Sequence, residues 1–201
     1  MTSRPPFGAK PSVLRCSRCG RFVDWEESRL QVVCECRPRL ELPPVLVHEA
    51  SDNDRAAVMD LFHRDFGRTQ ILAFGDLMRL DDAPALVAEM QGELAGALAY
   101  RLRGNALQIV ALATDPAWQR SGVGGYLVAE AELLARRLAL SRMLFSTTND
   151  NLPAMYFYQR RGYVISEVVV GALAALNAPP NNKGFGGIVV RDEVRLEKRL
   201  A

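Results

Sequence analysis

A glycine-rich segment between an apolar strand and a long helix constrains this chain more than any other feature. The segment reads Gln119-Arg120-Ser121-Gly122-Val123-Gly124-Gly125. Residues 107–113 before it are apolar enough for a buried strand. Residues 123–140 after it have the periodicity of an amphipathic helix whose inward stripe is Leu127, Ala131, Leu134 and Leu138. A strand, a glycine turn and a helix in this order favour an α/β fold.

The start of that helix is a candidate binding site for a phosphate group. The first N–H groups of a helix have no partner within it, and the helix dipole places partial positive charge there. Gly122 and Gly124 would let a phosphate approach the backbone without a Cβ in the way. Gln119, Arg120 and Ser121 offer additional side-chain donors. On these residues alone, the alternative is a glycine turn that binds no ligand.

Two common nucleotide-binding motifs do not match this segment. A P-loop needs a Lys followed by Ser or Thr after its last glycine, whereas Gly125 is followed by Tyr126. The dinucleotide fingerprint G-x-G-x-x-G does not fit the spacing of Gly122, Gly124 and Gly125. The segment therefore disfavours a nucleoside triphosphatase and a nicotinamide-dependent enzyme.

A second segment, residues 149–163, narrows the choice of ligand. Asn151 begins a short helix there, and Gly162 ends it before an aromatic-led strand. The first segment resembles the Q/R-x-x-G-x-G/A motif of the GNAT N-acetyltransferase superfamily. The second resembles that superfamily's N-x-x-A-x-x-(aromatic or Leu)-Y-x-x-x-G-(F/Y) motif, matched at Asn151, Ala154, Phe157, Tyr158, Gly162 and Tyr163. The resemblance covers about residues 45–200.

The resemblance implies an α/β (α+β mixed) architecture, the GNAT-like acyl-CoA N-acyltransferase fold. In that fold a mixed sheet has splayed central parallel strands and is flanked by helices. We expect a helix capped by Ser51 or Asp52 and ended by Gly67, and a hairpin that turns at Gln91-Gly92. The other expected helices are residues 123–140 and 152–161, and the expected strands are residues 45–48, 85–90, 94–102, 107–113, 143–146, 163–170 and 189–196.

The resemblance also implies how acetyl-CoA would bind. Backbone groups of Leu112, Ala113 and Thr114 would hold the pantetheine arm, and an amide within residues 111–113 would face the thioester oxygen. Asn151 would contact pantetheine, cap its helix, or do both. The pyrophosphate would lie on the amides of Arg120, Ser121, Gly122, Val123, Gly124 and Gly125, with Gln119 beside them. The acceptor would be selected by residues 64–79 and 171–187.

Tyr158 matches the tyrosine that donates a proton to the CoA sulfur in many family members. An unperturbed phenol has a pKa of about 10 and is protonated at neutral pH, which suits a general acid. The alternative is a packed tyrosine whose hydroxyl donates to a backbone carbonyl. Tyr156, two residues earlier on a helix, should point elsewhere. No general base is assigned, because residues 107–113 carry no acid and Glu89 and Glu167 are more typical of solvated surface charges.

The four cysteines form a separate cluster near the N-terminus. Cys16 and Cys19 are spaced C-x-x-C, and Cys34 and Cys36 are spaced C-x-C. A hairpin of residues 22–25 and 30–33 would bring the four thiolates together, an arrangement that suits tetrahedral Zn²⁺. The module resembles a zinc ribbon, although its second pair departs from the usual spacing. Four cysteine ligands would close the site, so the zinc would be structural.

We therefore divide the chain into a flexible tail (1–12), a zinc-ribbon-like module (13–42) and a GNAT acetyltransferase domain (43–201). The expected function is transfer of acetyl from acetyl-CoA to an amine of a small molecule or a peptide. The alternative is a zinc-ribbon binding protein whose GNAT-like domain senses acyl-CoA or serves as a scaffold. We expect a cytoplasmic protein without membrane association, and a formal net charge of +2 disfavours nucleic acid as a partner. A macromolecular partner for the ribbon and a homodimer are left open.

The zinc prediction is tested by metal analysis of the purified protein. We expect about one zinc per chain, because four thiolates complete a tetrahedral shell. Replacing Cys16 and Cys19 by Ser should abolish the bound zinc. Absence of zinc, with all four thiols titrating freely, would contradict the site.

Overall fold

The computed structural model describes residues 13–15, 22–24, 44–67, 70–173 and 183–200. The chain divides into two units, residues 1–42 and 43–201. In the first unit β1 (Val13–Arg15) pairs antiparallel with β2 (Phe22–Asp24). The strand expected at residues 22–25 is thus present, and it pairs with β1, which was not among the predicted strands. Residues 30–33 and the four cysteines lie outside the described residues, so the zinc ribbon stays a prediction.

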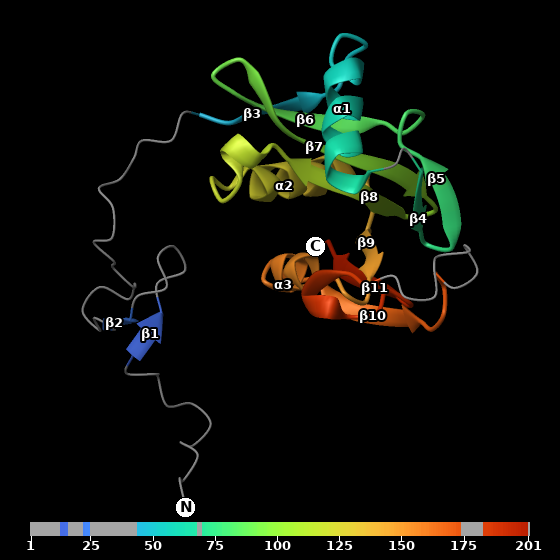
Figure 1. Ribbon diagram of the computed structural model, residues 1–201. Coiled ribbons are helices and arrows are strands. Elements are labelled where there is room, and N and C mark those ends of the chain that lie inside the picture. Colours follow the sequence, from blue (N-terminus) through green and yellow to red (C-terminus); the bar gives the residue numbers. More distant parts are fainter. Residues whose placement is uncertain (1–12, 16–21, 25–43, 68–69, 174–182, 201) are drawn as a thin grey trace, which may run out of the picture. The chain divides into compact units, whose positions relative to one another are not determined.

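The second unit is built on a mixed sheet of seven strands (Figure 1). The parallel pair that the sequence predicts is formed by β8 and β9, and the other neighbouring strands are antiparallel. The strands, in their order across the sheet, are β10 (Val164–Val169), β11 (Glu193–Arg199), β9 (Arg142–Thr148), β8 (Ala106–Thr114), β7 (Glu93–Arg103), β6 (Ala85–Met90) and β3 (Leu46–Glu49).

Helices cover both faces of this sheet, as expected (Figure 1). On one face, α1 (Arg55–Phe66) buries Val58, Leu61 and Phe62 against small side chains of β7 and β8. On the other face, α2 (Val123–Arg137) and α3 (Leu152–Gln159) enclose the larger apolar cluster, which includes Leu127, Phe145 and Tyr158. The two clusters form the core, and we call these two sides the α1 face and the α2 face.

Glycines at the turn before β7 and within β7 explain how closely this strand approaches the start of α2. The hairpin turn at Gln91-Gly92 has positive φ at both residues, 57° and 78°, as a two-residue turn between antiparallel strands requires. Gly96 lies where α2 begins to cross the sheet. A Cβ there would be 2.8 Å from Cγ1 of Val123 and 2.9 Å from the carbonyl oxygen of Ala113. Because Gly96 has no side chain, the first turn of α2 approaches the ends of β7 and β8 closely.

Three helix boundaries differ from the sequence predictions, and one of them is the end of α3, which lies at Gln159 instead of residue 161. The N-cap of α1 is Asp54, and Ser51 instead donates from its amide and its hydroxyl to the Asp54 carboxylate, both at 2.7 Å. α2 ends at Arg137, because Ala139 takes a left-handed φ of 54° and the chain turns back there. Leu138 is 45% exposed, so its assignment to the buried stripe was wrong, whereas Leu127, Ala131 and Leu134 are buried.

Two other segments were mispredicted or missed. The last strand is β11 (Glu193–Arg199), and residues 183–192 before it form a loop held by the side chain of Asn149. The sequence also failed to indicate the hairpin of β4 (Gln70–Ala73) and β5 (Asp76–Arg79). Its turn is Phe74-Gly75, with φ of 57° and 78°. Four-residue strands are too short for a reliable alternation of apolar and polar residues.

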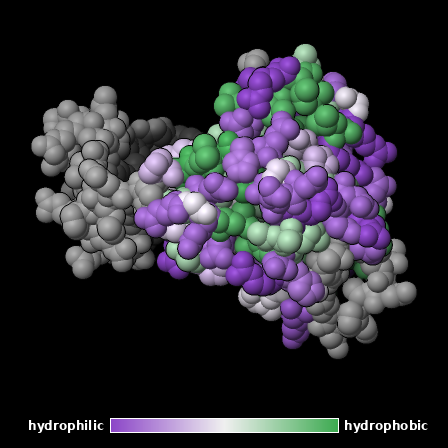
Figure 2. Space-filling model, turned by 90° about the horizontal axis from the view of Figure 1, so that it is seen from above, coloured by the Kyte–Doolittle hydropathy of each residue, from purple (hydrophilic) through white to green (hydrophobic). Residues whose placement is uncertain are grey.

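The surface is polar over most of the face drawn in Figure 2, where apolar residues gather in separate patches. None of the helices in the described part of the chain is long and apolar enough to cross a membrane.

Candidate functional site

The central feature of the candidate site is a gap between β8 and β9. The two strands are paired from Ala106–Arg142 to Ile109–Phe145 and no further. Beyond that point β8 stays with β7 as far as Thr114, and β9 stays with β11 as far as Thr148. The facing edges of residues 110–114 and 146–148 therefore make no ladder with each other, which leaves backbone donors and acceptors for a ligand.

A bulge in β8 marks the beginning of the gap. Ala99 is in register with Ala111, whereas the next residue, Tyr100, is in register with Ile109, so that Val110 is the extra residue. Such a bulge bends its strand and increases the local twist. The bend falls directly after the last residue of β8 that pairs with β9.

The glycine segment lies between the open end of β8 and the start of α2. A short 3-10 turn, Pro116–Trp118, precedes it, and Asp115 caps this turn by accepting from the amide of Ala117 at 3.0 Å. Gly122 has a φ of 98°, which favours glycine. Among the described residues, no backbone acceptor is found for the amides of Gly122, Val123 and Gly124. The structure thus has the free donors that an anion would need.

Side chains of the glycine segment are used partly within the loop itself. The hydroxyl of Ser121 donates to the carbonyl of Trp118, and Nε2 of Gln119 lies 3.4 Å from the carbonyl oxygen of Thr114. Arg120 is exposed and has a positive φ of 63°. The backbone amides, more than the side chains of Gln119 and Ser121, are therefore available to a ligand.

Three elements meet beside this loop. A Cβ added to Gly124 would lie 3.5 Å from the ring of Phe157 on α3 and 3.7 Å from Leu112 on β8. Asn151 caps α3, as the sequence predicts, by accepting from the amide of Ala154 at 3.2 Å. β8, the glycine segment and α3 are thus brought together at one edge of the gap, where Leu112, Gly124 and Phe157 lie close to one another on the α2 face.

Tyr158 lies on α3 at the vertex of the gap. Its ring stacks on Phe145, the last residue of β9 that pairs with β8, with centroids 3.7 Å apart and planes at 21°. The residue is 1% exposed, and its hydroxyl is buried with no hydrogen-bond partner among the described residues. Burial raises the pKa of Tyr158 well above its ordinary value, and the charge of Arg161 offsets only part of that increase. The expected backbone acceptor of the packed alternative is not found, and Tyr156 is 63% exposed, as predicted.

Arg161 belongs to this site, and sequence reasoning missed it. Its guanidinium lies 3.6 Å from the ring centroid of Phe157 and donates to the Phe157 carbonyl at 3.1 Å. Its Nη2 would be 2.6 Å from a Cβ on Gly125, so the glycine makes room for the arginine. Burial lowers the pKa of Arg161 from its ordinary value. In the sequence, the signal for this contact was that Arg161 follows Phe157 by four residues, about one helical turn.

A buried carboxylate, Glu193, lies on the opposite face and was also missed. It is 2% exposed, at the start of β11. One of its oxygens, Oε1, accepts from the hydroxyl of Ser146 and from the amide of Phe74. The other, Oε2, accepts from Nη2 of Arg195 at 2.8 Å and from Nε at 3.2 Å. In the sequence, Glu193 is one of several charged residues that alternate with apolar ones in the last strand, a pattern typical of a solvated face.

The two carboxylates weighed as bases from the sequence do not line the gap. Glu89 lies on β6, which β7 separates from β8, and its carboxylate is 3.5 Å from Nε2 of His48. Glu167 lies on the outer strand β10, where it pairs with Arg195 at 2.6 Å and its side chain is 55% exposed. Both therefore have the surroundings of surface charges.

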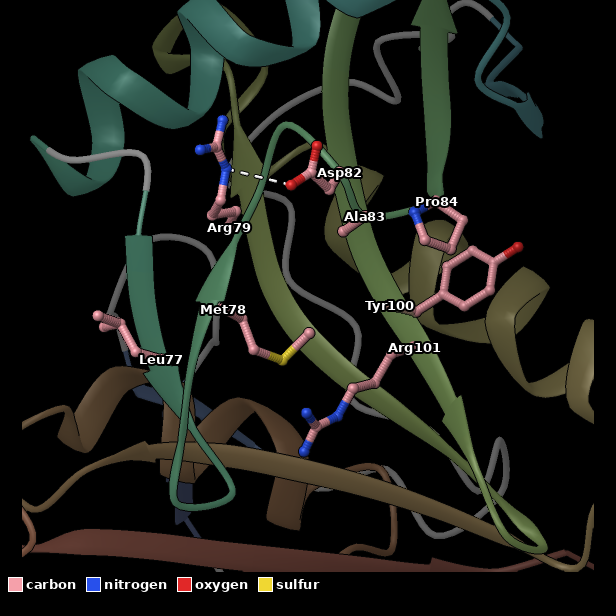
Figure 3. Close-up of a pocket in the computed structure, with 8 residues that line it drawn as sticks. All are labelled: Leu77, Met78, Arg79, Asp82, Ala83, Pro84, Tyr100 and Arg101. Atoms are coloured by element: carbon pink, nitrogen blue, oxygen red, sulfur yellow. Dashed lines mark ion pairs between the residues drawn. The ribbon is translucent and has the colours of Figure 1, made fainter.

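A hollow of about 360 Å³ lies elsewhere, between β5 and β7. Figure 3 shows Met78 and Arg101 reaching toward it, with Arg79 paired to Asp82 at 3.1 Å. Arg101 is in register with Gln108, where β8 is still paired with β9. The hollow thus borders the closed part of the sheet, and we do not assign the site to it.

Comparisons with known proteins agree with this geometry. A family model described as Acetyltransferase (GNAT) family matches residues 47–163. Protein YdhI of Bacillus subtilis is 29% identical over 143 residues, which are 69% of this chain and 88% of YdhI. A GNAT family acetyltransferase from Elizabethkingia anophelis with acetyl-CoA bound has a TM-score of 0.63 at 18% identity, covering 78% of this chain and 98% of that one. An acetyltransferase of Bacillus subtilis in complex with CoA has a TM-score of 0.59 at 21% identity, covering 80% and 100%. At these identities the solved structures establish the fold.

The unpartnered hydroxyl of Tyr158 predicts an unusual effect on stability. Tyr158→Phe should raise the free energy of unfolding by about 1 kcal/mol, because a buried hydroxyl without a partner is costly. Tyr163→Phe is the matched control, since the Tyr163 hydroxyl lies 3.4 Å from Oε1 of Glu132, and it should lower that free energy by about 1 kcal/mol. Denaturant unfolding measures both. Equal losses in the two variants would mean that the Tyr158 hydroxyl has a partner.

Proposed function

This chain belongs to the acetyltransferase (GNAT) family, and from that premise we propose that it transfers an acetyl group from acetyl-CoA to an amine. Family membership makes it an acyltransferase. The acceptor would be an amine of a small molecule or of a peptide. The alternative left open by the sequence, a domain that binds acyl-CoA without catalysis as a sensor or scaffold beside a zinc ribbon at residues 13–42, is disfavoured by that membership.

The observation that carries the proposal is the loss of pairing between β8 and β9 after Ile109 and Phe145. A pantetheine arm contains two amides, and it can hydrogen-bond to an open strand edge much as a neighbouring strand would. Backbone groups of Leu112, Ala113 and Thr114 would hold it there. The solved structures with acetyl-CoA or CoA bound support the same class of ligand, because their fold is similar.

The pyrophosphate of CoA would lie on the amides at the start of α2. Those of Gly122, Val123 and Gly124 have no backbone acceptor in the described part of the chain, and partial positive charge from the helix dipole adds to them. Arg161 lies against the same turn, beside Gly125, and adds a full positive charge. An anion is therefore favoured at this position by charge as well as by hydrogen bonding.

Tyr158 would protonate the thiolate of CoA as it leaves. Its raised pKa keeps the hydroxyl protonated at neutral pH, so a proton is available when the carbon–sulfur bond breaks. The lack of an internal partner leaves the hydroxyl free to donate to a ligand. Because a raised pKa also makes the phenol a weak acid, we expect it to act as charge develops on the sulfur.

Acetyl-CoA binding is tested at Gly122 with a pair of variants. Gly122→Asp would place a carboxylate at the N-cap of α2, where it competes with the pyrophosphate for the same amides. Gly122→Asn has nearly the same size and the same backbone strain but no charge. We expect acetyl-CoA to bind at least about tenfold more weakly to the Asp variant than to the Asn variant, measured by titration calorimetry. Equal affinities would count against an anion site at this turn.

Catalysis by Tyr158 is tested by Tyr158→Phe with labelled acetyl-CoA and a panel of primary amines. We expect kcat to fall by roughly 10–100-fold with little change in the Kd for acetyl-CoA, because the hydroxyl acts only on the leaving sulfur. Since the pKa of Tyr158 is raised, this group should cause no loss of kcat as the pH rises from 7 to 9. Unchanged turnover in the variant would remove Tyr158 as the acid.

A further inference from the structure

We propose that Ser146 and Glu193 together remove the proton from the attacking amine, with Glu193 acting through the hydroxyl of Ser146. This inference rests on the proposed function, since it assigns the base that the proposed acetyl transfer requires. An amine must be neutral to attack a thioester, whereas most amines arrive at neutral pH as ammonium ions. Ser146 is the residue that would touch the substrate, and Glu193 is a positioning residue.

The place of Ser146 follows from the geometry of β9. Phe145 is the last residue paired with β8, and Ser146 is the first residue of β9 that faces the gap. Successive side chains of a strand point to opposite faces. Phe145 stacks on Tyr158 on the α2 face, so Ser146 points to the α1 face. The proposed acid and the proposed proton acceptor thus come from opposite sides of the sheet to the same point of the gap.

The side chains of β8 on the α1 face of the gap are apolar and mostly small. Ala111 and Ala113 belong to the apolar cluster beneath α1, whereas Leu112 packs on the α2 face. On the α1 side of the gap β8 therefore contributes Val110 and two small alanine methyl groups. A reacting amine would approach between them and the Ser146 hydroxyl.

The hydrogen bonds of Glu193 orient the Ser146 hydroxyl for this task. The Ser146 hydrogen is donated to Oε1 of Glu193, so the lone pairs of the serine oxygen are free to accept a second hydrogen. The amide of Phe74 donates to the same oxygen, and Arg195 holds Oε2. These donors hold the carboxylate in one position beside the Ser146 hydroxyl.

The proton balance of the step is simple. The ammonium nitrogen gives one proton to the Ser146 oxygen while the serine hydrogen moves to Oε1 of Glu193, leaving a neutral amine and a protonated carboxyl group. The amine nitrogen then forms a bond to the thioester carbon, and the carbon–sulfur bond breaks. The sulfur takes a proton from Tyr158, and the nitrogen releases its second excess proton, which restores Tyr158. Glu193 returns its proton to solvent before the next cycle.

A purely structural role is the competing explanation for Glu193, because a carboxylate paired with Arg195 and bonded to Phe74 also ties the β4–β5 hairpin to β11. The experiment therefore needs a measurement that the loss of a purely structural contact would leave unchanged. We compare Glu193→Gln and Ser146→Ala with the wild type, and use Glu167→Gln as the matched control. Glu167 is the other carboxylate bound to Arg195, and its side chain is 55% exposed.

The acetyl donor is acetyl-CoA. The ammonium acceptor is benzylamine, lysine or a peptide with an N-terminal alanine, whichever the wild type acetylates. Hydroxylamine is the second acceptor, because it is already neutral at neutral pH. With the ammonium substrate we expect kcat/KM to fall roughly 100-fold in both variants, with the Kd for acetyl-CoA unchanged. At pH values below the pKa of the amine, log kcat/KM of the two variants should rise by about one for each pH unit. This rise should be steeper than in the wild type, because the variants can use only the fraction of amine that is already neutral in solution. With hydroxylamine the variants should approach the wild type. Glu167→Gln should match the wild type throughout.

The double variant adds an independent criterion. Because Ser146 and Glu193 act in one path, the combined substitution should cost no more than either single one. If Glu193→Gln unfolds, Ser146→Ala alone carries the test, since it removes only a hydroxyl. Variants that keep the wild-type slope, or that lose activity equally with hydroxylamine, would overturn the inference while leaving acetyl transfer intact. A wild type that acetylates none of the amines would instead contradict the proposed function itself.

Discussion

The parting of β8 and β9 is the constraint on which the rest of the second unit depends. The two strands share a short parallel ladder, and then each keeps only its antiparallel neighbour on the far side. The sheet is thereby divided into two halves, β3-β6-β7-β8 and β9-β11-β10, that meet at one ladder. Phe145 and Ser146 straddle the end of that ladder and point to opposite faces. The gap therefore presents different chemistry on each face of the sheet.

Two buried carboxylates, Glu132 and Glu193, connect β11 to the elements that pack on the two faces of the sheet. On the α2 face, Nζ of Lys198 on β11 lies 2.8 Å from both oxygens of Glu132 on α2, and the Tyr163 hydroxyl lies 3.4 Å from the same carboxylate. On the α1 face, Glu193 of β11 accepts from the amide of Phe74 in the hairpin. Breaking one partner of a buried pair leaves a charge uncompensated, so such ties resist further opening of the gap. They give a sheet with a broken ladder the rigidity that a binding site needs.

The site itself holds groups that the fold leaves unpaired. The amides at the start of α2, the open edge of β8 and the hydroxyl of Tyr158 all lack partners among the described residues. The buried hydroxyl of Tyr158 has an unfavourable free energy in the free protein, offset by the two apolar clusters on either side of the sheet. A ligand with phosphates at one end, amides in the middle and a thioester at the other would supply partners for all three. This complementarity links the stability of the free protein to its proposed substrate.

The sequence by itself determined the glycine turn, the cap of α3 by Asn151 and the order along the chain of the three helices and the seven strands of the large sheet, because each of these is decided by neighbours within about one helical turn or one hairpin. It also pointed to Tyr158 through its motif. Only the tertiary structure decided that Glu193 is buried. Its partners Ser146 and Phe74 are 47 and 119 residues away in the chain, and an alternating charged strand read alone belongs in solvent. Likewise, Arg161 lies beside Gly125 only because α3 packs against the start of α2. Charges that meet across distant segments leave no local pattern, and for that reason the sequence indicated the proposed acid, Tyr158, but not the proposed base, Glu193.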